Sequence, residues 1–245
     1  MPLPGLLAQL TAEPGRPRLT WYAPAERVEL SGHVLDNWVT KTANLLVEEY
    51  DAGPGTRVLL DLPVHWRSVV WAFAVWRVGA CVMVPGASTT RVDLVVTDRP
   101  AAHSGGDIVA VALPALARSF DGDLPPGVVD ATGAVMTYGD VLTWMPEPDP
   151  LSPALQAEGS VVAHRDLDRW AARILTANGG IHPHGRVLVA DSTGRAALAD
   201  ALAVALAVYV ADGSVVLCGK GASEDVDLLQ RLVTTELVTE QVRLG

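Results

Sequence analysis

A strand-to-helix turn at residues 190–194 carries residue types that could form a nucleophilic site. It reads ADSTG and partly matches the Gly-x-Ser-x-Gly turn that exposes a catalytic serine in many hydrolases, with Ser192 as the nucleophile. The first glycine of that motif is missing, and the last histidine of the chain, His184, precedes Ser192, whereas such hydrolases place their histidine after the serine. The pattern therefore favours a helix N-cap, with Asp191, Ser192 or Thr193 as the capping residue.

His182 and His184 flank a proline and are the best candidates for metal ligands. No carboxylate, cysteine or third histidine stands at helical spacing from them, so the pattern favours a surface turn. The two cysteines, Cys81 and Cys218, lie in strand-like apolar runs, where a buried reduced thiol is expected in place of a disulfide or a metal ligand. We therefore expect no metal site.

Residues 213–220 superficially match a Walker phosphate-binding loop. Five residues separate Gly213 from Gly219, and Gly221 follows Lys220 where the motif needs Ser or Thr. The spacing therefore indicates an ordinary connection between a strand and a helix.

Composition and charge exclude several classes of protein. Of the 245 residues, 49% are apolar, so the chain can bury a substantial core and disorder is not expected. The formal net charge of -10 argues against nucleic acid or an anionic membrane as the main partner, because both need a basic surface. No signal peptide is evident, and the most apolar run, residues 196–211, is shorter than the roughly 20 residues of a membrane span. We expect a core helix there and a cytoplasmic protein.

The elements that position these residues are organised around a strand, a helix and a second strand in the first third of the chain. Residues 57–62 follow a Gly-Pro-Gly turn and predict the first strand, and residues 81–84 predict the second. Between them, residues 65–78 are apolar around nearly the whole circumference of a helix, which predicts a buried helix that ends at Gly79. We expect its tryptophans, Trp66, Trp71 and Trp76, to pack in the core and not to stack against a ligand.

Strands and helices alternate along the rest of the chain. The predicted helices are residues 6–10, 35–50, 167–177, 196–210 and 225–236, the second of them capped by Ser31. The predicted strands are residues 19–22, 28–30, 94–97, 108–113, 186–190 and 214–218. This alternation predicts an α/β fold with mostly parallel sheets and right-handed crossovers.

A stretch rich in Gly, Pro and Asp separates two halves of the chain. We expect residues 1–120 to form a first α/β half, residues 121–153 a connector, and residues 154–245 a second α/β half. One compact domain that includes all three is the alternative.

The order of motifs in the first third of the chain resembles that of a known family. GPGTRV at residues 53–58, the apolar helix and GACVMVP at residues 79–85 resemble the opening of the AMP-binding domain of the adenylate-forming superfamily, which includes acyl-CoA synthetases, luciferases and peptide-synthetase adenylation domains. The residues that match the family's helix end and strand end are Arg77, Gly79, Ala80, Val84 and Pro85. The resemblance implies a fold like the first part of the AMP-binding large domain, as in short, truncated bacterial relatives.

The resemblance also implies a phosphate-binding loop, which the residues fail to supply. The family holds ATP phosphates with the loop Thr-Ser-Gly-Thr-Thr-Gly-x-Pro-Lys-Gly, and SVVAHRDL at residues 160–167 resembles the helix start that follows it. Counting back places residues 150–158 at the loop, so that Ser152, Glu158 and Gly159 mark a degenerate phosphate-loop position. Prolines in this stretch lack amide donors. Glu158 reverses the charge of the family's lysine, which costs on the order of several kcal/mol in a partly screened site.

The family's catalytic lysine has no match either. It belongs to a separate C-terminal domain, and the only lysines here, Lys41 and Lys220, lie on an early helix and between a strand and a helix. We therefore expect no catalytic residue and no cofactor, which favours a chain that is not an enzyme but leaves the question open.

These patterns predict a catalytically inactive, truncated relative of acyl-CoA synthetases that acts as a binding, scaffold or regulatory protein. Two alternatives stay open: an adenylate-forming ligase whose nucleotide site is degenerate or completed by a partner subunit, and a vestigial nucleotide or acyl sensor. A chain cut from a larger fold leaves apolar surface, so a homo-oligomer or a protein partner is expected.

Overall fold

The chain folds into two compact units, each built from separate stretches of sequence. The computed structural model describes residues 3–87, 91–142, 144–147, 149–177, 180–191 and 193–244. The first unit comprises Met1–Asp36, Pro63–Val69 and Asp166–Gly245, and the second comprises Asn37–Leu62 and Val70–Arg165. These units do not coincide with the halves 1–120 and 154–245, because the N-terminal hairpin joins the sheet that the C-terminal strands build.

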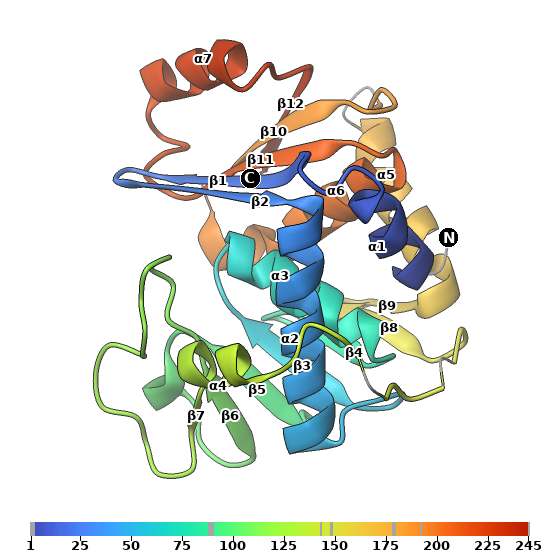
Figure 1. Cartoon of the computed structure of the whole chain (residues 1–245), viewed down its shortest axis with the longest axis vertical. Coiled ribbons are helices and arrows are strands. Elements are labelled where there is room, and N and C mark those ends of the chain that lie inside the picture. Colours follow the sequence, from blue (N-terminus) through green and yellow to red (C-terminus); the bar gives the residue numbers. More distant parts are fainter. Residues whose placement is uncertain are drawn as a thin grey trace. The chain divides into compact units, whose positions relative to one another are not determined.

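The first unit contains a five-stranded sheet with the order β12-β10-β11-β1-β2 (Figure 1). β1 and β2 form an antiparallel hairpin, and the other three strands run parallel to β1. The strands are β1 (Pro17–Ala23), β2 (Glu26–Ser31), β10 (Arg186–Asp191), β11 (Ser214–Cys218) and β12 (Glu240–Leu244). The helices are α1 (Leu3–Thr11), α5 (Leu167–Ala177), η3 (Gly194–Ala197), α6 (Leu198–Val210) and α7 (Val226–Thr235).

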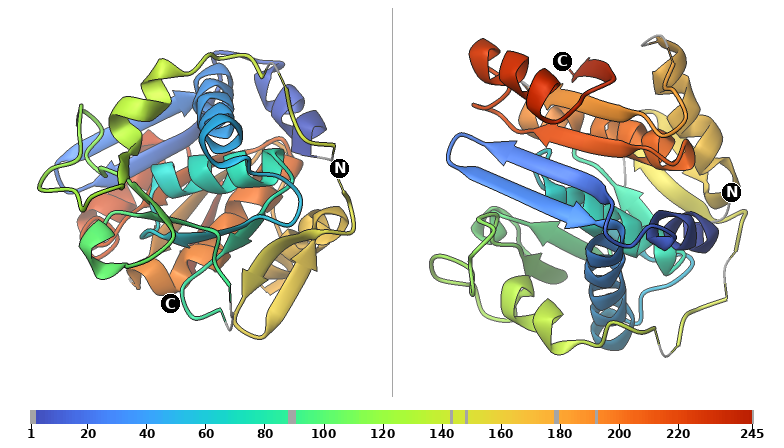
Figure 2. Two further views of the ribbon diagram at one scale, coloured as in Figure 1. Left: turned by 90° about the horizontal axis from the view of Figure 1, so that it is seen from below. Right: turned by 45° about the horizontal axis from the view of Figure 1, so that its top comes forward.

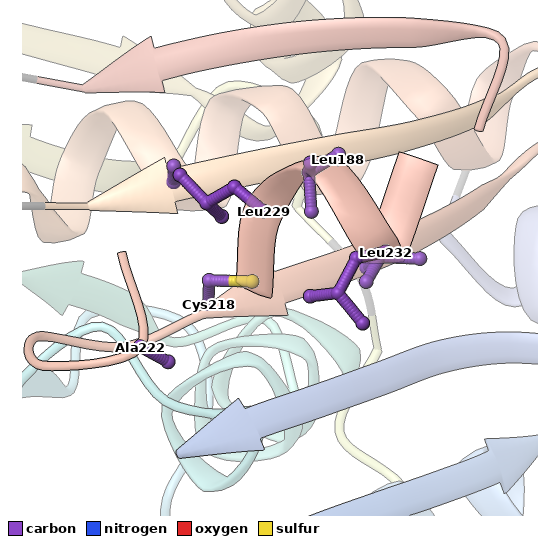
Figure 3. Packing of buried hydrophobic residues seen from close by; sticks show 7 residues of the cluster. Leu188, Cys218, Ala222, Leu229 and Leu232 are labelled. Carbon is purple, nitrogen blue, oxygen red and sulfur yellow. The ribbon is translucent and has the colours of Figure 1, made fainter. Parts of the chain in front are cut away.

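Apolar side chains join α7 to its sheet in the first unit. Leu229 and Leu232 of α7 belong to one buried cluster with Leu188 and Cys218 of the strands (Figure 3). Burial raises the pKa of the Cys218 thiol to about 12, so this cysteine is a protonated, buried thiol, as expected. Most residues of α6 are buried as well, which confirms that the most apolar run of the sequence is a core helix. No helix of the described residues is long and apolar enough to cross a membrane.

The second unit contains a seven-stranded sheet with the order β7-β6-β5-β3-β4-β8-β9 (Figures 1 and 2). Neighbouring strands are parallel except β8 and β9, which form an antiparallel hairpin. The strands are β3 (Arg57–Asp61), β4 (Cys81–Met83), β5 (Leu94–Thr97), β6 (Asp107–Ala110), β7 (Val129–Asp130), β8 (Pro153–Ala157) and β9 (Ser160–Ala163). The unit also holds the short helices η1 (Pro100–Ala102), α4 (Ala131–Thr137) and the start of η2 (His164–Asp166). Two longer helices, α2 (Gly32–Tyr50) and α3 (Trp66–Arg77), begin in the first unit and end in the second.

Helix α3 is buried along its length, as its sequence predicts. Trp66, Trp71 and Trp76 are 2%, 3% and 2% exposed, which confirms that they pack in the core. The indole Nε1 of Trp76 donates a hydrogen bond to the carbonyl oxygen of Ala154 in β8 at 2.8 Å. The helix ends before Gly79, whose φ of 79° lies in the left-handed region that glycine adopts without strain.

The expected hairpin, the expected strands and the six expected helices are all present, with boundaries that shift by a few residues. The hydroxyl of Ser31 accepts a hydrogen bond from the amide of Val34 at 3.4 Å, in keeping with its expected cap. The sequence patterns do not predict α4, β7, β8, β9, β12 or the short helices η1 and η2. Three of these begin within residues 121–153, so that stretch is not a plain connector.

Candidate functional site

The position expected for the phosphate loop is a tight β-hairpin. β8 pairs in parallel with β4 and antiparallel with β9, where Leu155 lies opposite Val162. Residues 153–157, which counting along the sequence assigns to the loop, are therefore strand. Only Glu158 and Gly159 remain as a turn between the paired residues Ala157 and Ser160.

The turn of this hairpin has little with which to hold a phosphate. Glu158 and Gly159 are both exposed, and Gly159 has a φ of 68°, in the left-handed region. Phosphate-binding loops surround the anion with several successive backbone amides and a positive side chain. A two-residue turn offers at most two amides, and the side chain at this one is a carboxylate. The described turn therefore has fewer amides than such a loop, and its side chain carries the opposite charge.

Ser152 lies directly before β8 and is 8% exposed. Its hydroxyl and its backbone amide both donate to the carbonyl oxygen of Asp149, at 2.8 and 3.1 Å. Its own carbonyl oxygen accepts from the amide of His164 at 3.1 Å. These bonds fix the open end of the hairpin, so Ser152 has a structural role in this arrangement and does not present its hydroxyl to a ligand.

His164 begins η2 immediately after β9, in the segment that resembles the family's helix start. Its ring is partly buried, and burial lowers its pKa below the ordinary value, although the backbone carbonyls of Gly79 and Ala80 act in the opposite direction. The ring is therefore neutral at pH 7. The ring therefore does not replace the positive charge of the lysine that the family's phosphate loop carries.

Asp191 occupies the turn between β10 and η3 in the first unit and is 1% exposed. Its Oδ1 accepts hydrogen bonds from the amides of Thr193 and Gly194 at 2.9 and 3.1 Å, and from the hydroxyl of Thr193 at 3.1 Å. The residue at the N-cap position of η3 is Thr193, whose side chain makes no cap bond, so the carboxylate of Asp191 binds these amides from two and three positions earlier. Because the carboxylate occupies these amides, the start of the helix does not offer them to an anion. Ser192 lies outside the described residues, so its role stays a prediction.

Neither lysine belongs to the hairpin turn at Glu158 and Gly159 or to the turn at Asp191. Lys41 on α2 donates through Nζ to the carbonyl oxygen of Tyr138, and Lys220 is exposed in a turn after β11.

His182 and His184 lie in an exposed turn, as expected, with 85% and 66% of their side chains accessible. Each contacts a different carboxylate: His182 Nδ1 lies 2.5 Å from Glu240 Oε1, and His184 Nδ1 lies 2.9 Å from Asp212 Oδ2. No group of three metal-ligating side chains occurs among the residues that the structure describes.

A polar cluster that the sequence did not predict lies at the C-terminal ends of β3 and β5. Asp61 ends β3, and its side chain is 5% exposed. Its carboxylate accepts from the hydroxyl of Thr97 at 3.1 Å and from Arg99 Nη2 at 2.9 and 3.0 Å, and it lies 2.9 Å from Nε2 of His103. Residues 36 to 42 positions apart in sequence thus meet at one edge of the sheet.

This cluster lies where the strand order of the sheet reverses direction. The chain passes from β3 to β4 on one side and then returns to place β5 on the other side of β3. In open α/β sheets, ligands bind outside the carboxyl ends of the strands at such a switch point. The strand alternation in the sequence could have located both strand ends, but no motif marks Asp61 as a partner of Arg99.

Comparison with solved structures identifies the class of fold. The chain is similar to the acetoacetyl-CoA synthetase of Streptomyces lividans (TM-score 0.75, 15% identity), an acyl-CoA synthetase of Brucella canis (0.72, 17%) and the amide bond synthetase McbA of Marinactinospora thermotolerans (0.66, 16%). The matches cover 98%, 97% and 98% of this chain but only 42%, 47% and 48% of those chains. The protein therefore has the fold of part of an adenylate-forming enzyme and spans less than half the length of these structures.

The family follows from a relative of similar length. A TIGR03089 family protein of Mycobacterium tuberculosis is 36% identical over 241 residues, which cover 94% of this chain and 93% of the relative. The chain belongs to the TIGR03089 family. A scan against protein-family models gives no match.

Proposed function

We propose that this protein is a catalytically inactive relative of acyl-CoA synthetases that acts by binding, as a scaffold or regulatory protein. The observation that supports this most is the two-residue turn Glu158–Gly159 at the position of the phosphate loop. An enzyme that activates an acid with ATP must stabilise the charge of the reacting phosphates with directed donors and cations. The turn provides a carboxylate instead.

The neighbouring groups support the same conclusion. The hydroxyl of Ser152 is committed to Asp149, and His164 is neutral at pH 7 because of its burial. At close range in a partly screened site, the repulsion between the Glu158 carboxylate and a triphosphate is on the order of several kcal/mol. A loss of that size reduces affinity by about a thousandfold.

We also propose that the protein works in the cytoplasm through association with further copies of itself or with another protein. Its net charge of -10 disfavours nucleic acid and anionic membranes. Large apolar side chains are exposed on the second unit, among them Trp144 (60%) and Leu151 (64%), which a partner surface would bury.

Turnover assays test the absence of catalysis. The purified chain is mixed with ATP, magnesium and a panel of carboxylic acids; released pyrophosphate is measured, and acyl-adenylate is sought by mass spectrometry. The proposal predicts no release above the buffer control, while an acyl-CoA synthetase run in parallel gives a signal. Release that depends on both ATP and the acid overturns the proposal. Release only after a second purified polypeptide is added establishes the alternative of a ligase completed by a partner subunit.

The Asp61 cluster favours a second candidate function, a nucleotide or acyl sensor without turnover. Buried Asp61 holds the guanidinium of Arg99, which is 54% exposed, so a fixed cation faces solvent at the switch point of the sheet. A sensor predicts that ATP or an acyl phosphate raises the melting temperature of the protein. Arg99→Ala should remove this shift, whereas Arg91→Ala, which removes a more exposed arginine (74%), should retain it. No shift with the intact chain, or an equal shift with Arg99→Ala, excludes the sensor.

A further inference from the structure

One buried carboxylate holds two other side chains at the edge of the seven-stranded sheet. Oδ2 of Asp61 accepts a hydrogen bond from Nη2 of Arg99 at 3.0 Å and lies 2.9 Å from Nε2 of His103. Because both nitrogens contact the same oxygen, the guanidinium and the imidazole lie close enough for one small ligand to touch both. The side chain of Asp61 is 5% exposed, whereas those of Arg99 and His103 are 54% and 22% exposed. A ligand from solvent therefore meets the guanidinium and the ring before the carboxylate.

The neighbouring strand fixes Asp61 in turn. The hydroxyl of Thr97, at the end of β5, donates to Oδ2 at 3.1 Å, and the backbone amide of Arg99 donates to that hydroxyl at 3.0 Å. Thr97 is 0% exposed, so this part of the cluster lies inside the unit. A fixed carboxylate restricts the rotamers of the two side chains that contact it. The guanidinium and the imidazole are therefore arranged before a ligand arrives, which lowers the entropy cost of binding.

Arg99 keeps hydrogen-bond donors for a ligand. Among the described residues, its side chain bonds to Asp61 through Nη2, and the N–H groups of Nε and Nη1 are not used there. A guanidinium binds the oxygens of phosphate and carboxylate groups through such donors. The cluster also lies at the carboxyl ends of β3 and β5, at the switch point of the sheet, where ligands bind in open α/β folds. We therefore expect the anionic oxygen of a ligand at Arg99.

His103 supplies the opposite kind of group. A carboxylate only accepts hydrogen bonds, so in the neutral ring the proton lies on Nε2, the nitrogen that faces Asp61. Nδ1 is then an acceptor, and within the part of the chain that the structure describes no group donates to it. An oxyanion without a proton would place a lone pair against this nitrogen. An oxyanion that carries its own hydroxyl satisfies both Arg99 and His103.

We propose that Asp61, Arg99 and His103 form a binding site for hydrogen phosphate. Arg99 donates to an anionic oxygen of the phosphate, and Nδ1 of His103 accepts a hydrogen bond from its hydroxyl. Asp61 is a positioning residue, which fixes the guanidinium and the tautomer of the ring without touching the ligand. Hydrogen phosphate keeps a proton at neutral pH and sulfate does not, so the site selects between two anions of nearly the same shape.

This inference rests on the same fixed cation, Arg99, as the sensor proposed above, but its ligand is free phosphate and not a nucleotide or an acyl phosphate. The two can therefore fail separately. Phosphate binding without any thermal shift from ATP or an acyl phosphate excludes the nucleotide or acyl sensor and leaves this site in place. A thermal shift from ATP in a chain that does not retain phosphate overturns this site alone.

Equilibrium dialysis of the purified chain against radiolabelled phosphate, from about 0.01 to about 10 mM at constant ionic strength and about pH 7.5, tests the proposal. We expect one phosphate per chain, and sulfate should compete about tenfold more weakly because one hydrogen bond is lost. Arg99→Ala should abolish the retention of phosphate. Arg91→Ala is the matched control, because it removes an arginine that also pairs with an aspartate, Asp93, but lies before β5 and not at its carboxyl end. This variant should retain phosphate as the intact chain does.

Two substitutions test the selectivity for phosphate over sulfate. His103→Gln can still donate to Asp61 from its amide but has no acceptor at the position of Nδ1, so it should bind the two anions about equally. Asp61→Asn can donate to Nε2 and so move the ring proton to Nδ1, which should also remove the preference for phosphate. A merely structural role of Asp61 would lower the affinity for both anions and leave their ratio unchanged.

Circular dichroism and the melting temperature check that these variants fold. If Asp61→Asn does not fold, His103→Gln, at a partly exposed side chain, still tests the selectivity. No phosphate retained by the intact chain up to about 10 mM overturns the proposal. So does sulfate that competes as well as phosphate, retention that Arg99→Ala leaves unchanged, or a preference for phosphate that persists in His103→Gln.

Discussion

Helix α3 and the hairpin β8–β9 differ in what their side chains face. α3 is enclosed, with its three tryptophans at most 3% exposed, whereas the hairpin presents Val161 and the charged turn to solvent. A hydrogen bond from Trp76 to Ala154 connects the two. The comparison teaches that the adenylate-forming fold is held by contacts that do not depend on ATP. We propose that this chain keeps the buried framework while its exposed turn does not bind phosphate.

The largest expected effect comes from the buried side of this comparison. Trp76→Ala removes a core side chain and the donor to Ala154, and should lower the free energy of unfolding by about 3–5 kcal/mol. Trp144→Ala removes a tryptophan that is 60% exposed and should change it by less than about 0.5 kcal/mol. Urea denaturation measures both. Equal losses of unfolding free energy for the two variants would contradict the assignment of α3 as a buried core helix.

The start of α3 adds a pH dependence to the buried side. His65 is 4% exposed, and burial, with a smaller contribution from Arg67, lowers its pKa to about 3. The ring is neutral in the folded chain and takes up a proton below about pH 6.5 in the unfolded chain. The free energy of unfolding is therefore unaffected by this group above pH 6.5 and falls as the pH is lowered toward 3. The loss at pH 5 is about 2 kcal/mol.

His65→Asn tests this dependence. Asparagine does not titrate, and its side-chain oxygen can still accept the amide of Arg67, which Nδ1 of His65 accepts at 3.2 Å. The loss of stability between pH 7.5 and pH 5 should therefore be about 2 kcal/mol smaller in this variant. Parallel stability curves for the two proteins would show that His65 is not the group responsible.

Patterns in the sequence predicted the buried side of the molecule well. Apolar spacing identified α3, α6 and the parallel strands β3, β4, β5, β6, β10 and β11, because burial of whole faces leaves a periodic signal. It missed β8 and β9, because PALQA and SVVA are short and lack alternation, and because the prolines before them indicate a loop. It also missed β12, whose EQVRL is too polar to be recognised as a parallel strand.

A turn in the first unit offers a comparison with the turn of the hairpin. Asp191 satisfies the amides at the start of the helix from within the chain, so Asp191→Ala should lower the free energy of unfolding by about 1–2 kcal/mol. Asp191→Asn keeps one acceptor oxygen and should lose less. Thermal or urea unfolding of the two variants measures the difference. A loss no larger for alanine than for asparagine would argue against a stabilising role for these hydrogen bonds.

The smallest expected effect lies in the hairpin turn itself. Neither Gly159 nor Gly133 has an atom within 4 Å of the position that a Cβ would take, but only Gly159 has a positive φ, of 68°. Gly159→Ala should therefore destabilise the protein by about 1 kcal/mol, while Gly133→Ala in α4 should stabilise it by about 0.5–1 kcal/mol. Melting temperatures of the two variants should move in opposite directions. A shift in the same direction would mean that the turn differs from the one described.

The candidate site was only partly predictable. The proposal that the phosphate-loop position is degenerate can be made from Glu158 and the prolines alone, since charge and missing donors are properties of single residues. The tight turn could not be predicted, because it depends on the pairing of β8 with β9. The contact of Asp61 with Arg99 and His103 was also out of reach, since it joins residues 38 and 42 positions apart that only the sheet brings together.

Calorimetric titration of the purified chain with ATP and magnesium tests the central claim most directly. The account predicts no binding tighter than about 100 µM, which corresponds to roughly 5.5 kcal/mol, because the turn at Glu158 and Gly159 offers neither donors nor positive charge. A saturating isotherm with a tighter dissociation constant would show that a nucleotide site is present, and would contradict the claim.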